Sequence, residues 1–455
     1  MERKVQTMIN KVYFLTLGCS KNDIDTECMI SLLDSNKYEH TKNFDDANIV
    51  IINTCSFILD AKEQSINSII ELGELKNQTF KYLLVAGCLG QRYPEQLLDE
   101  MDEIDGVIGT GQISNINEIL DSTVNGERKA HVGFINAPYT ENASRNDFKV
   151  TQYIKISEGC NNHCAYCVIP SLRGRMRSRP IENILNEAKF LAQNGVKELI
   201  LIAQNTSEYG IDIYGKPMLH ELLYELNQIE DLHWIRILYM YPEGFYDELI
   251  DSIATCDKVV KYVDMPLQHI SDNVLRAMNR HTDKKSICDL IIKLRERIPN
   301  IIIRSTFIVG FYNESRKNFD ELKKFIEEYK LDRIGAFCYS LEEGTRAYKY
   351  GDQVSEDEKL LRQKELMLLQ AEISERKLSK KIGLNMECLI EDETDDAYIG
   401  RTYMDAPGID GLIYINKDKT LNIDEFYDII ITGNDSYDLY GKLVLEKWIY
   451  PIRSL

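Results

Sequence analysis

The sequence predicts an α/β protein that contains an open parallel α/β domain, a partial barrel of alternating strands and helices, and a small antiparallel β-barrel. Three patterns in the 455 residues predict it. Strand–loop–helix units repeat near the N-terminus, strands and helices keep alternating through the middle, and short strands between Gly, Asp and Asn turns fill the end. A chain of this length exceeds one hydrophobic core, which favours several domains.

The bulk composition is that of a globular protein outside the membrane. Hydrophobic residues make up 44% and charged residues 28%, which excludes a disordered chain. The sequence has no apolar run of about eighteen residues, so we expect no transmembrane helix. The segment MERKVQTMIN lacks the apolar stretch of a signal peptide. We therefore expect a cytoplasmic protein whose eleven cysteines are reduced thiols.

The formal net charge is -19, which bears on the kind of partner. An acidic surface repels nucleic acid unless a local basic patch overrides the overall charge, because nucleic-acid affinity depends on phosphate neutralisation. A basic protein partner suits this charge better. Solubility alone is an equal explanation, since many cytoplasmic enzymes are acidic.

The N-terminal strand–loop–helix units share one unusual feature, a cysteine where the strand ends. The strands are VYFLTL, NIVIINTC and KYLLVAGC, with a weaker fourth at GVIGTG. Cys19, Cys55 and Cys88 take these equivalent positions. Ligands collect at the carboxyl edge of open parallel sheets, so we expect the three thiols to form one ligand set. The alternative is three separately buried cysteines, a common role for this residue.

The middle of the chain repeats strands and helices after a polar linker, NAPYTENASRNDFKV. Six candidate strands follow the linker: QYIKISEGC, ELILIAQN, WIRILYMYP, KYVDMPLQ, IIIRSTFIVGF and RIGAFCYS. Repeated βα units over about 200 residues indicate a TIM-like barrel, and six strands favour an open, partial one.

The last region changes to short alternating strands after a charged helical connector. The strands are MECLIED, AYIGRTY, DGLIYI, FYDIIITG and YDLYGKLVL. About five short strands in this length predict a small antiparallel barrel of OB-like type. The predicted boundaries are 11–145 for the N-terminal domain, 146–353 for the partial barrel, 354–382 for the connector and 383–455 for the final barrel.

The segment CNNHCAYC carries the chemistry. Cys160, Cys164 and Cys167 have CxxxCxxC spacing on a loop directly after a strand, and thiolates are ligands suited to zinc or iron–sulfur clusters. A structural zinc site needs four ligands, and His163 is awkwardly placed between two cysteines to be the fourth. Three thiolates on a 4Fe–4S cluster leave one iron open for S-adenosylmethionine. Together with Tyr166, this arrangement is typical of radical-SAM enzymes, in preference to zinc or a plain electron-transfer cluster.

The chain resembles the radical-SAM methylthiotransferase family over nearly its whole length. LGCSKN is similar to the family's opening motif, and Cys19, Cys55 and Cys88 match its ligands for a second 4Fe–4S cluster. The final barrel resembles the family's TRAM domain. The resemblance implies conversion of a carbon–hydrogen to a carbon–thiomethyl bond, with S-adenosylmethionine as both radical source and methyl donor. It implies no catalytic residues beyond the cluster ligands.

Several segments resemble the branch of the family that modifies an aspartate of ribosomal protein S12. They are Lys21 after the first cysteine, PSLRGRMRSRP, YMYPEG, DMPLQHISD and DAPGIDG. Ser20, Asn205 and Tyr312-Asn313 depart from that branch, and none of them is a cluster ligand. A transfer-RNA methylthiotransferase is the alternative, and a non-catalytic iron–sulfur sensor is a rival from another class.

The charge of the final domain favours the ribosomal-protein branch independently of the motifs. From Gly383 to Leu455 there are fifteen Asp or Glu and six Lys or Arg. Such a surface repels RNA and attracts a basic ribosomal protein. We therefore expect S12 as partner and no nucleic-acid partner. The resemblance implies an electron donor such as flavodoxin or ferredoxin, and nothing in the sequence demands more than a monomer.

Weaker predictions concern residues near barrel strand ends. Gln204, Arg304 and Gly310 are predicted to contact S-adenosylmethionine, with ordinary barrel-edge structure as the equal alternative. Four arginines after the cluster loop could hold a carboxylate or form a solvated face. They are Arg173, Arg175, Arg177 and Arg179. The five other cysteines are predicted to be packing residues: Cys28, Cys256, Cys288, Cys338 and Cys388.

Overall fold

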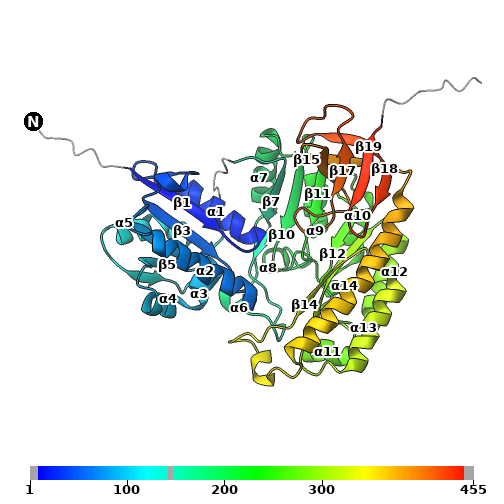
Figure 1. Ribbon diagram of the computed structural model, residues 1–455, viewed down its shortest axis with the longest axis horizontal. Coiled ribbons are helices and arrows are strands. Elements are labelled where there is room, and N and C mark those ends of the chain that lie inside the picture. The colour runs from blue at the N-terminus through cyan, green and yellow to red at the C-terminus, as the bar shows by residue number, and fades with distance from the viewer. Residues whose placement is uncertain (1–8, 142–144, 146, 445–455) are drawn as a thin grey trace, which may run out of the picture. The chain divides into compact units, whose positions relative to one another are not determined.

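The computed structural model describes residues 9–141, 145 and 147–444, which form two compact units (Figure 1). Unit 1 contains the described residues up to His233 together with the segment Ser340–Gly351. Unit 2 contains Trp234–Tyr339 and the described residues from Asp352 onward. No helix among the described residues is both long and apolar enough to cross a membrane.

Unit 1 begins with a six-stranded sheet in which every neighbouring pair is parallel, in the order β2-β1-β3-β4-β5-β6. The strands are β1 (Asn10–Thr16), β2 (Tyr38–His40), β3 (Ile49–Thr54), β4 (Tyr82–Ala86), β5 (Gly106–Ile108) and β6 (Lys129–His131). The predicted open parallel domain is confirmed. The edge strands β2 and β6 were not predicted, because three residues are too few to show a periodic pattern.

Helices cover both faces of this sheet. α1 (Ser20–Leu32) and α5 (Ile116–Val124) pack with one set of strand residues, including Ile49 and Ile51. α2 (Leu59–Leu75) and α4 (Pro94–Glu100), together with the short α3 (Gly87–Arg92), pack with the alternate set, including Val50 and Ile52. β3 is buried on both faces, which explains its unbroken apolar run. The short helices η1 (Phe44–Asp46) and η2 (Ile113–Asn115) lie in the connections.

The rest of unit 1 carries the CxxxCxxC loop. β7 (Thr151–Lys155) pairs in parallel with β10 (Glu198–Ile202), and the loop lies between β8 (Ser157–Glu158) and α6 (Ile169–Arg173). β8 pairs with β9 (Arg177–Ser178). The remaining elements of the unit are α7 (Ile181–Gln193), α8 (Ile211–Tyr214), α9 (Leu219–Asn227) and η4 (Ala347–Tyr350).

Unit 2 begins with the later strands of the partial barrel. β12 (Tyr262–Asp264), β13 (Ile302–Val309) and β14 (Arg333–Cys338) form a parallel sheet, as the sequence predicts. β11 (Trp234–Ile237) precedes them. The helices that alternate with these strands are α10 (Asp247–Thr255), α11 (Asp272–Ala277), α12 (Lys284–Arg297) and α13 (Arg316–Tyr329), with η3 (Pro242–Gly244) after β11.

The end of unit 2 is a closed five-stranded barrel, reached through α14 (Glu356–Leu378) and η5 (Ser379–Lys381). Its strands are β15 (Asn385–Glu393), β16 (Ala397–Thr402), β17 (Ile413–Asn416), β18 (Phe426–Asn434) and β19 (Leu439–Leu443). The predicted small barrel is confirmed, and four of its pairs are antiparallel. β17 and β19 are neighbours in the barrel and pair in parallel. β18 lies between them in sequence and runs antiparallel to β19, so β19 has the same direction as β17.

Candidate metal centre

The three N-terminal cysteines lie at the carboxyl edge of adjacent strands. Cys19 caps the start of α1 just after β1, Cys55 directly follows β3, and Cys88 lies in the first turn of α3 after β4. β1, β3 and β4 are neighbours in the sheet. Three thiols separated by long stretches of sequence therefore share one edge of unit 1, as the strand–loop–helix repeat predicts. We call them the sheet triad.

A glycine allows two members of the sheet triad to approach. Gly18 has φ +99°, and a Cβ placed on it would lie 2.7 Å from Cys55 Cβ and 3.4 Å from Cys55 Sγ. Burial, together with the neighbouring thiols of Cys88 and Cys19, raises the pKa of Cys55 to about 11. The sheet-triad thiol of Cys55 is thus protonated at neutral pH, and a bound metal would have to displace its proton.

Cys160, Cys164 and Cys167 occupy one tight loop, which we call the loop triad. The backbone N–H of Cys160 donates to Gly174 O at 3.1 Å, and that of Cys167 donates to Cys164 O at 3.1 Å. Gly159 has φ +83°, and a Cβ there would meet Arg175 O at 2.2 Å. Burial raises the pKa of Cys160 to about 11. The loop is held to the segment after α6 too closely for a side chain at position 159.

The donor atoms of the two triads limit the kind of metal group they could hold. In the described part of the chain, no three His, Cys, Asp or Glu side chains converge closely enough to hold one metal ion. Zinc ligands converge on a single point. The cysteines of a 4Fe–4S cluster each bind a different iron, so their sulfurs need not converge. The three thiolates of each triad are soft ligands of the kind that iron–sulfur clusters use.

Unpaired polar atoms beside the triads also suit a bound polar group. Among the described residues, the buried atoms that lack a hydrogen-bond partner include Ser56 Oγ, Asn162 Nδ2, Gln204 Oε1 and Asn205 Nδ2. Ser56 follows a sheet-triad cysteine and Asn162 lies within the loop triad. Gln204 and Asn205 follow β10. Buried polar atoms are costly when unpaired, so these positions fit contact with a ligand.

One guanidinium connects the two triads. Arg173, at the end of α6, is 3% exposed. Its Nη2 lies 3.6 Å from Cys88 Sγ and donates to Asn22 Oδ1 at 2.8 Å. Its Nη1 lies 2.6 Å from Asp25 Oδ2 and 3.3 Å from Glu158 Oε2. Since Glu158 is two residues before Cys160, Arg173 joins the sheet triad to the strand that leads into the loop triad.

Lys155 completes this buried charge network. Its ammonium lies 2.5 Å from Asp25 Oδ1 and 2.6 Å from Glu158 Oε2. Burial opposes ionisation of Glu158, but Lys155 and Arg173 hold its pKa well below its usual range. Gln204 Nε2 donates to Glu158 Oε1 at 2.6 Å. The predicted S-adenosylmethionine contact Gln204 is therefore fixed beside the loop triad by a carboxylate.

Apolar contacts join the same two segments. Val168 and Leu172, which come directly after the CxxxCxxC motif, pack against Cys88. Thr110 donates a hydrogen bond to the carbonyl of Leu172. The helix that follows the loop triad is thus a wall of the sheet-triad site, and both triads belong to one compact unit.

The returning segment Ser340–Gly351 supplies a second ion-pair cluster. Glu342 Oε2 lies 2.8 Å from Lys62 Nζ and 2.8 Å from Arg92 Nη1. The same Arg92 nitrogen donates to Ser56 O at 2.8 Å, beside Cys55. Burial raises the pKa of Glu342, but hydrogen bonds from Lys62, Ser340 and Arg92 outweigh it and lower the pKa.

Sequence reasoning missed most of these charged partners. Asp25, Lys155, Glu158, Arg92 and Glu342 were not predicted to belong to the site. One signal was available, because a lysine and a glutamate interrupt the otherwise apolar YIKISE segment that leads into the loop. A charge inside a buried strand must be paired, which points to an acidic partner elsewhere in the chain.

The remaining predicted contacts have other surroundings. Tyr166 is half-buried directly before Cys167. Arg304 belongs to unit 2 and lies near the beginning of β13, where its Nη1 pairs with Asp264 at 2.7 Å and its Nε with Asp410 at 3.5 Å. Gly310 has φ +78°, and a Cβ there would clash with Lys359. Ion pairs within the chain account for Arg304, and the close approach of Lys359 accounts for a glycine at position 310, so neither residue requires a ligand.

The arginine cluster after the loop divides into buried and exposed members. Arg173 and Arg179 are 3% exposed and paired with carboxylates within the chain, Arg179 with Glu141 and Glu187 at 2.7 Å each. Arg177 is half-buried and donates to the Arg175 carbonyl at 2.6 Å. Only Arg175 of the four is exposed. Binding of a substrate carboxylate by the whole cluster would require breaking these internal pairs.

Three segments of the chain match models of known protein families. Residues 11–109 match the Uncharacterized protein family UPF0004, residues 154–326 the Radical SAM superfamily, and residues 382–444 the TRAM domain. The curated protein "Ribosomal protein uS12 methylthiotransferase RimO" of Thermoanaerobacter sp. (strain X514) is 46% identical over 95% of this chain and 100% of its own length. The protein of the same name from Clostridium botulinum (strain Eklund 17B / Type B) is 47% identical over 96% of this chain and 99% of its own length.

Two solved structures have a similar fold. The radical S-adenosylmethionine methyltransferase TsrM from Kitasatospora setae superposes with a TM-score of 0.55 at 14% identity, covering 73% of this chain and 75% of that chain. The cobalamin-dependent S-adenosylmethionine radical enzyme OxsB gives a TM-score of 0.51 at 14% identity, covering 79% of this chain and 56% of that chain. At these identities the likeness concerns the fold alone.

Proposed function

The chain belongs to the RimO family of ribosomal protein uS12 methylthiotransferases, and from this premise we propose that its two cysteine triads hold two 4Fe–4S clusters that act together on uS12. As a member of this family it is a radical-SAM enzyme, and its substrate is the ribosomal protein uS12. We propose that the modified position is the β-carbon of an aspartate in that protein, which gains a thiomethyl group.

The loop triad is proposed to bind the cluster that activates S-adenosylmethionine. A 4Fe–4S cluster held by these residues would supply the electron that cleaves S-adenosylmethionine to a 5′-deoxyadenosyl radical. Cys160, Cys164 and Cys167 provide the three thiolates. Tyr166 and Gln204 lie next to this loop, and we propose them as contacts of S-adenosylmethionine. Gln204 keeps one buried oxygen without a partner in the described chain, which supports this role.

The sheet triad is proposed to bind the second cluster, whose open iron would carry the sulfur to be methylated and inserted. Cys19, Cys55 and Cys88 provide its thiolates. Cys19 is the most exposed of the three, while Cys88 is buried against α6. The cluster would therefore be anchored on its Cys88 side and accessible on its Cys19 side, where a methyl donor and a substrate can approach.

The observation that carries the proposal is the position of Arg173. Its guanidinium contacts Cys88 Sγ and also Glu158, beside the loop triad. Radical transfer needs the hydrogen to be abstracted and the sulfur to be inserted within one cavity. A single buried side chain that contacts both cysteine neighbourhoods supports such a shared cavity.

The acidic final barrel supports the protein substrate. Its fifteen carboxylates against six basic side chains favour a basic partner such as a ribosomal protein. We further propose a cytoplasmic monomer with the domain boundaries predicted from the sequence, which is reduced by a flavodoxin or ferredoxin.

The test is thiomethylation of a peptide. The anaerobically reconstituted and reduced protein is incubated with S-adenosylmethionine and a peptide that copies the aspartate loop of uS12, and products are read by mass spectrometry. We expect a gain of one thiomethyl group on the aspartate. Formation of 5′-deoxyadenosine with an unmodified peptide but a methylthio-adenosine in added transfer RNA would contradict the assignment of substrate.

The number of clusters is tested separately by a Cys19→Ala/Cys55→Ala/Cys88→Ala variant. We expect it to lose about half of the iron and all thiomethylation, while it still forms 5′-deoxyadenosine. Unchanged iron content would contradict the two-cluster proposal. A Cys28→Ala variant, which removes another cysteine of the same domain, is the matched control.

A further inference from the structure

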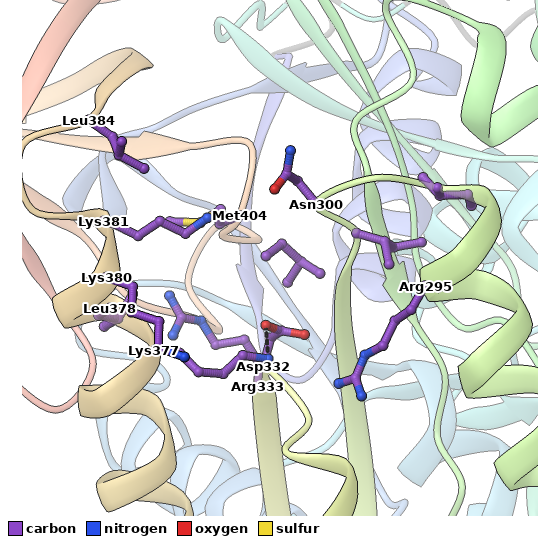
Figure 2. Close-up of a pocket in the computed structure, with 13 residues that line it drawn as sticks. Arg295, Asn300, Asp332, Arg333, Lys377, Leu378, Lys380, Lys381, Leu384 and Met404 are labelled. Carbon is purple, nitrogen blue, oxygen red and sulfur yellow. Dashed lines mark ion pairs between the residues drawn. The ribbon is translucent and has the colours of Figure 1, made fainter.

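Unit 2 contains a cavity of about 310 Å³ that the proposed chemistry does not use. It lies between the end of α12, the first residues of β13 and β14, the end of α14, and the start of the final barrel (Figure 2). Ligands of βα barrels bind at the carboxyl ends of the strands. This cavity is at the opposite ends, because it is lined by Ile302, the first residue of β13, and by Arg333, the first residue of β14.

The length of β13 separates the cavity from the catalytic end of the barrel. β13 has eight residues, from Ile302 to Val309. At about 3.3 Å per residue, its two ends lie on the order of 20 Å apart. A ligand in the cavity would therefore occupy a site distinct from the one where S-adenosylmethionine binds in such barrels.

The walls of the cavity are rich in cations. Lys377, Lys380 and Lys381 lie on one side, and Arg295 lies on the other (Figure 2). Asp332 is the one carboxylate among the lining residues, and it pairs with Lys377. Arg295, Lys380 and Lys381 form no ion pair with any residue that the structure describes. In a chain of net charge -19, this is a local excess of positive charge.

The effect of this excess is visible on Lys377. Burial lowers the pKa of its ammonium, and the neighbouring Arg295 and Lys381 lower it further, although Asp332 opposes them. The cations are thus close enough to repel one another. An anion placed between Arg295, Lys380 and Lys381 would stabilise these three positive charges.

The floor of the cavity is apolar. Ile301 is 6% exposed and Met404 is 2% exposed, and both line it with Leu378. At the rim, Leu384 is 49% exposed. The volume is at the small end of ligand pockets, which suits a single flat group rather than a folded partner. The site therefore combines an apolar floor with a cationic rim.

We propose that this cavity binds one nucleotide of a single-stranded RNA segment, with its base on Ile301, Met404 and Leu384 and its phosphates between Arg295 and the Lys380-Lys381 pair. Lysine and arginine neutralise the phosphates of single strands, and a base can lie in van der Waals contact with the apolar side chains of the floor. An acidic peptide could also use the cationic rim, so a glutamate oligopeptide is included as one arm of the test. The basic uS12 protein is repelled by the rim.

The proposal rests on the proposed function in one respect, the source of the RNA. The proposed RNA is ribosomal RNA, which accompanies uS12 on the ribosome, so the cavity would hold the enzyme on an RNA-containing particle. The acidic barrel and the basic cavity then have separate partners, a basic protein and an RNA strand. This changes the expectation from total charge, which excluded nucleic acid unless a local basic patch was present.

The test is equilibrium binding of a fluorescent oligoadenylate to the full-length, cluster-loaded protein, followed by anisotropy. We expect the affinity to fall by about twenty-fold between about 50 and about 200 mM NaCl, because three cations replace counterions on a single strand. A Lys380→Glu/Lys381→Glu variant should bind at least about tenfold more weakly at the lower salt concentration, with a flatter salt dependence.

The matched control is Lys324→Glu/Lys364→Glu, which makes the same change of charge at exposed positions of α13 and α14. It should leave the affinity within about twofold. The proposal would be overturned if both variants lost affinity equally or if the wild type did not bind the oligoadenylate. It would also be overturned if adenosine monophosphate or a glutamate oligopeptide bound as tightly as the oligoadenylate. Thiomethylation of the isolated uS12 peptide should be unchanged in the Lys380→Glu/Lys381→Glu variant, so failure here is separate from failure of the proposed function.

Discussion

The two cysteine triads are built in different ways. The loop triad comes from eight consecutive residues, and backbone hydrogen bonds of the loop hold Cys160 and Cys167 in place. The sheet triad comes from three strands, and its spacing depends on the parallel pairing of β1, β3 and β4. The first arrangement is local and the second is tertiary, although both belong to the same compact unit.

The difference teaches what each site depends on. A loop triad tolerates changes elsewhere in the chain as long as its own backbone is preserved. A sheet triad depends on register, because slipping one strand by a residue would turn its cysteine away from the shared edge. Arg173 joins the two, so a change at this residue should affect the sheet triad through Cys88 without altering the loop motif.

The largest expected effects come from removing one cysteine of each triad. Cys164→Ala should abolish formation of 5′-deoxyadenosine, because the cluster that binds S-adenosylmethionine would lose a ligand. Cys55→Ala should abolish thiomethylation but leave 5′-deoxyadenosine formation within about twofold. Chromatography of the nucleoside and mass spectrometry of the peptide measure the two products. If both variants lost both products, the triads would not have separate roles.

Glycine substitutions test the two backbones. Gly159→Ala places a Cβ 2.2 Å from Arg175 O, and Gly18→Ala places one 2.7 Å from Cys55 Cβ. Each should lower iron content by up to about half, through its own triad. Gly195→Ala is the control, because its φ is +93° but nothing lies within 4 Å of the new Cβ. Comparable iron loss in the control would attribute the effect to backbone strain alone.

Arg173→Met tests the connection between the triads. Asp25 and Glu158 would then be balanced by Lys155 alone, and removing one partner of a buried ion network costs about 3–5 kcal/mol of unfolding free energy. The reduction potential of the sheet-triad cluster, measured by an EPR-monitored titration, should also fall when the positive charge near Cys88 is lost.

The control for this change is Arg175→Met, which removes an exposed arginine two residues away. Its unfolding free energy should change by less than about 0.5 kcal/mol. Arg173→Lys keeps the charge and should recover part of the potential. If Arg173→Met destabilised the protein without any change in potential, its role would be structural and not connected with the cluster.

The Glu342 cluster gives a smaller, pH-dependent effect. The folded-state pKa of Glu342 is below its usual 4.5, so it stabilises the protein above that pH and loses its contribution as pH falls through the folded value. Glu342→Gln should lower Tm at neutral pH and flatten its decline below about pH 4.5. Glu343→Gln, at the exposed neighbouring position, should follow the wild-type Tm curve. A Glu342→Gln curve parallel to the wild type would contradict the pairing with Lys62 and Arg92.

The smallest effect is expected from the five remaining cysteines. Replacing them one at a time with alanine should leave iron content unchanged, because none belongs to a triad. Cys28 and Cys388 are buried, and burial raises the pKa of Cys28 to about 12. Iron measured after anaerobic reconstitution checks this outcome, and a loss of iron in any of the five variants would overturn the assignment of ligands.

Strand patterns determined most of the fold from the sequence. The apolar runs around Val50 and Leu84, and the six strands of the partial barrel, were predicted because parallel strands buried on both faces read as unbroken apolar segments. The edge strands β2 and β6, and the parallel closure between β17 and β19, were not predicted. Both depend on which segments meet in space, and such pairings leave no local pattern.

The sequence by itself determined the loop triad, since CxxxCxxC spacing sets which thiols share a loop, and it determined the family through motifs that extend along the chain. Tertiary structure alone decided the surroundings of the sites. The pairing of Arg173 with Asp25 and Cys88, and the cavity between Arg295 and Lys381, join residues far apart in sequence. The interaction energy of two charges depends on their separation in space and not on their separation in sequence. The lining of a cavity likewise depends on which residues meet in three dimensions.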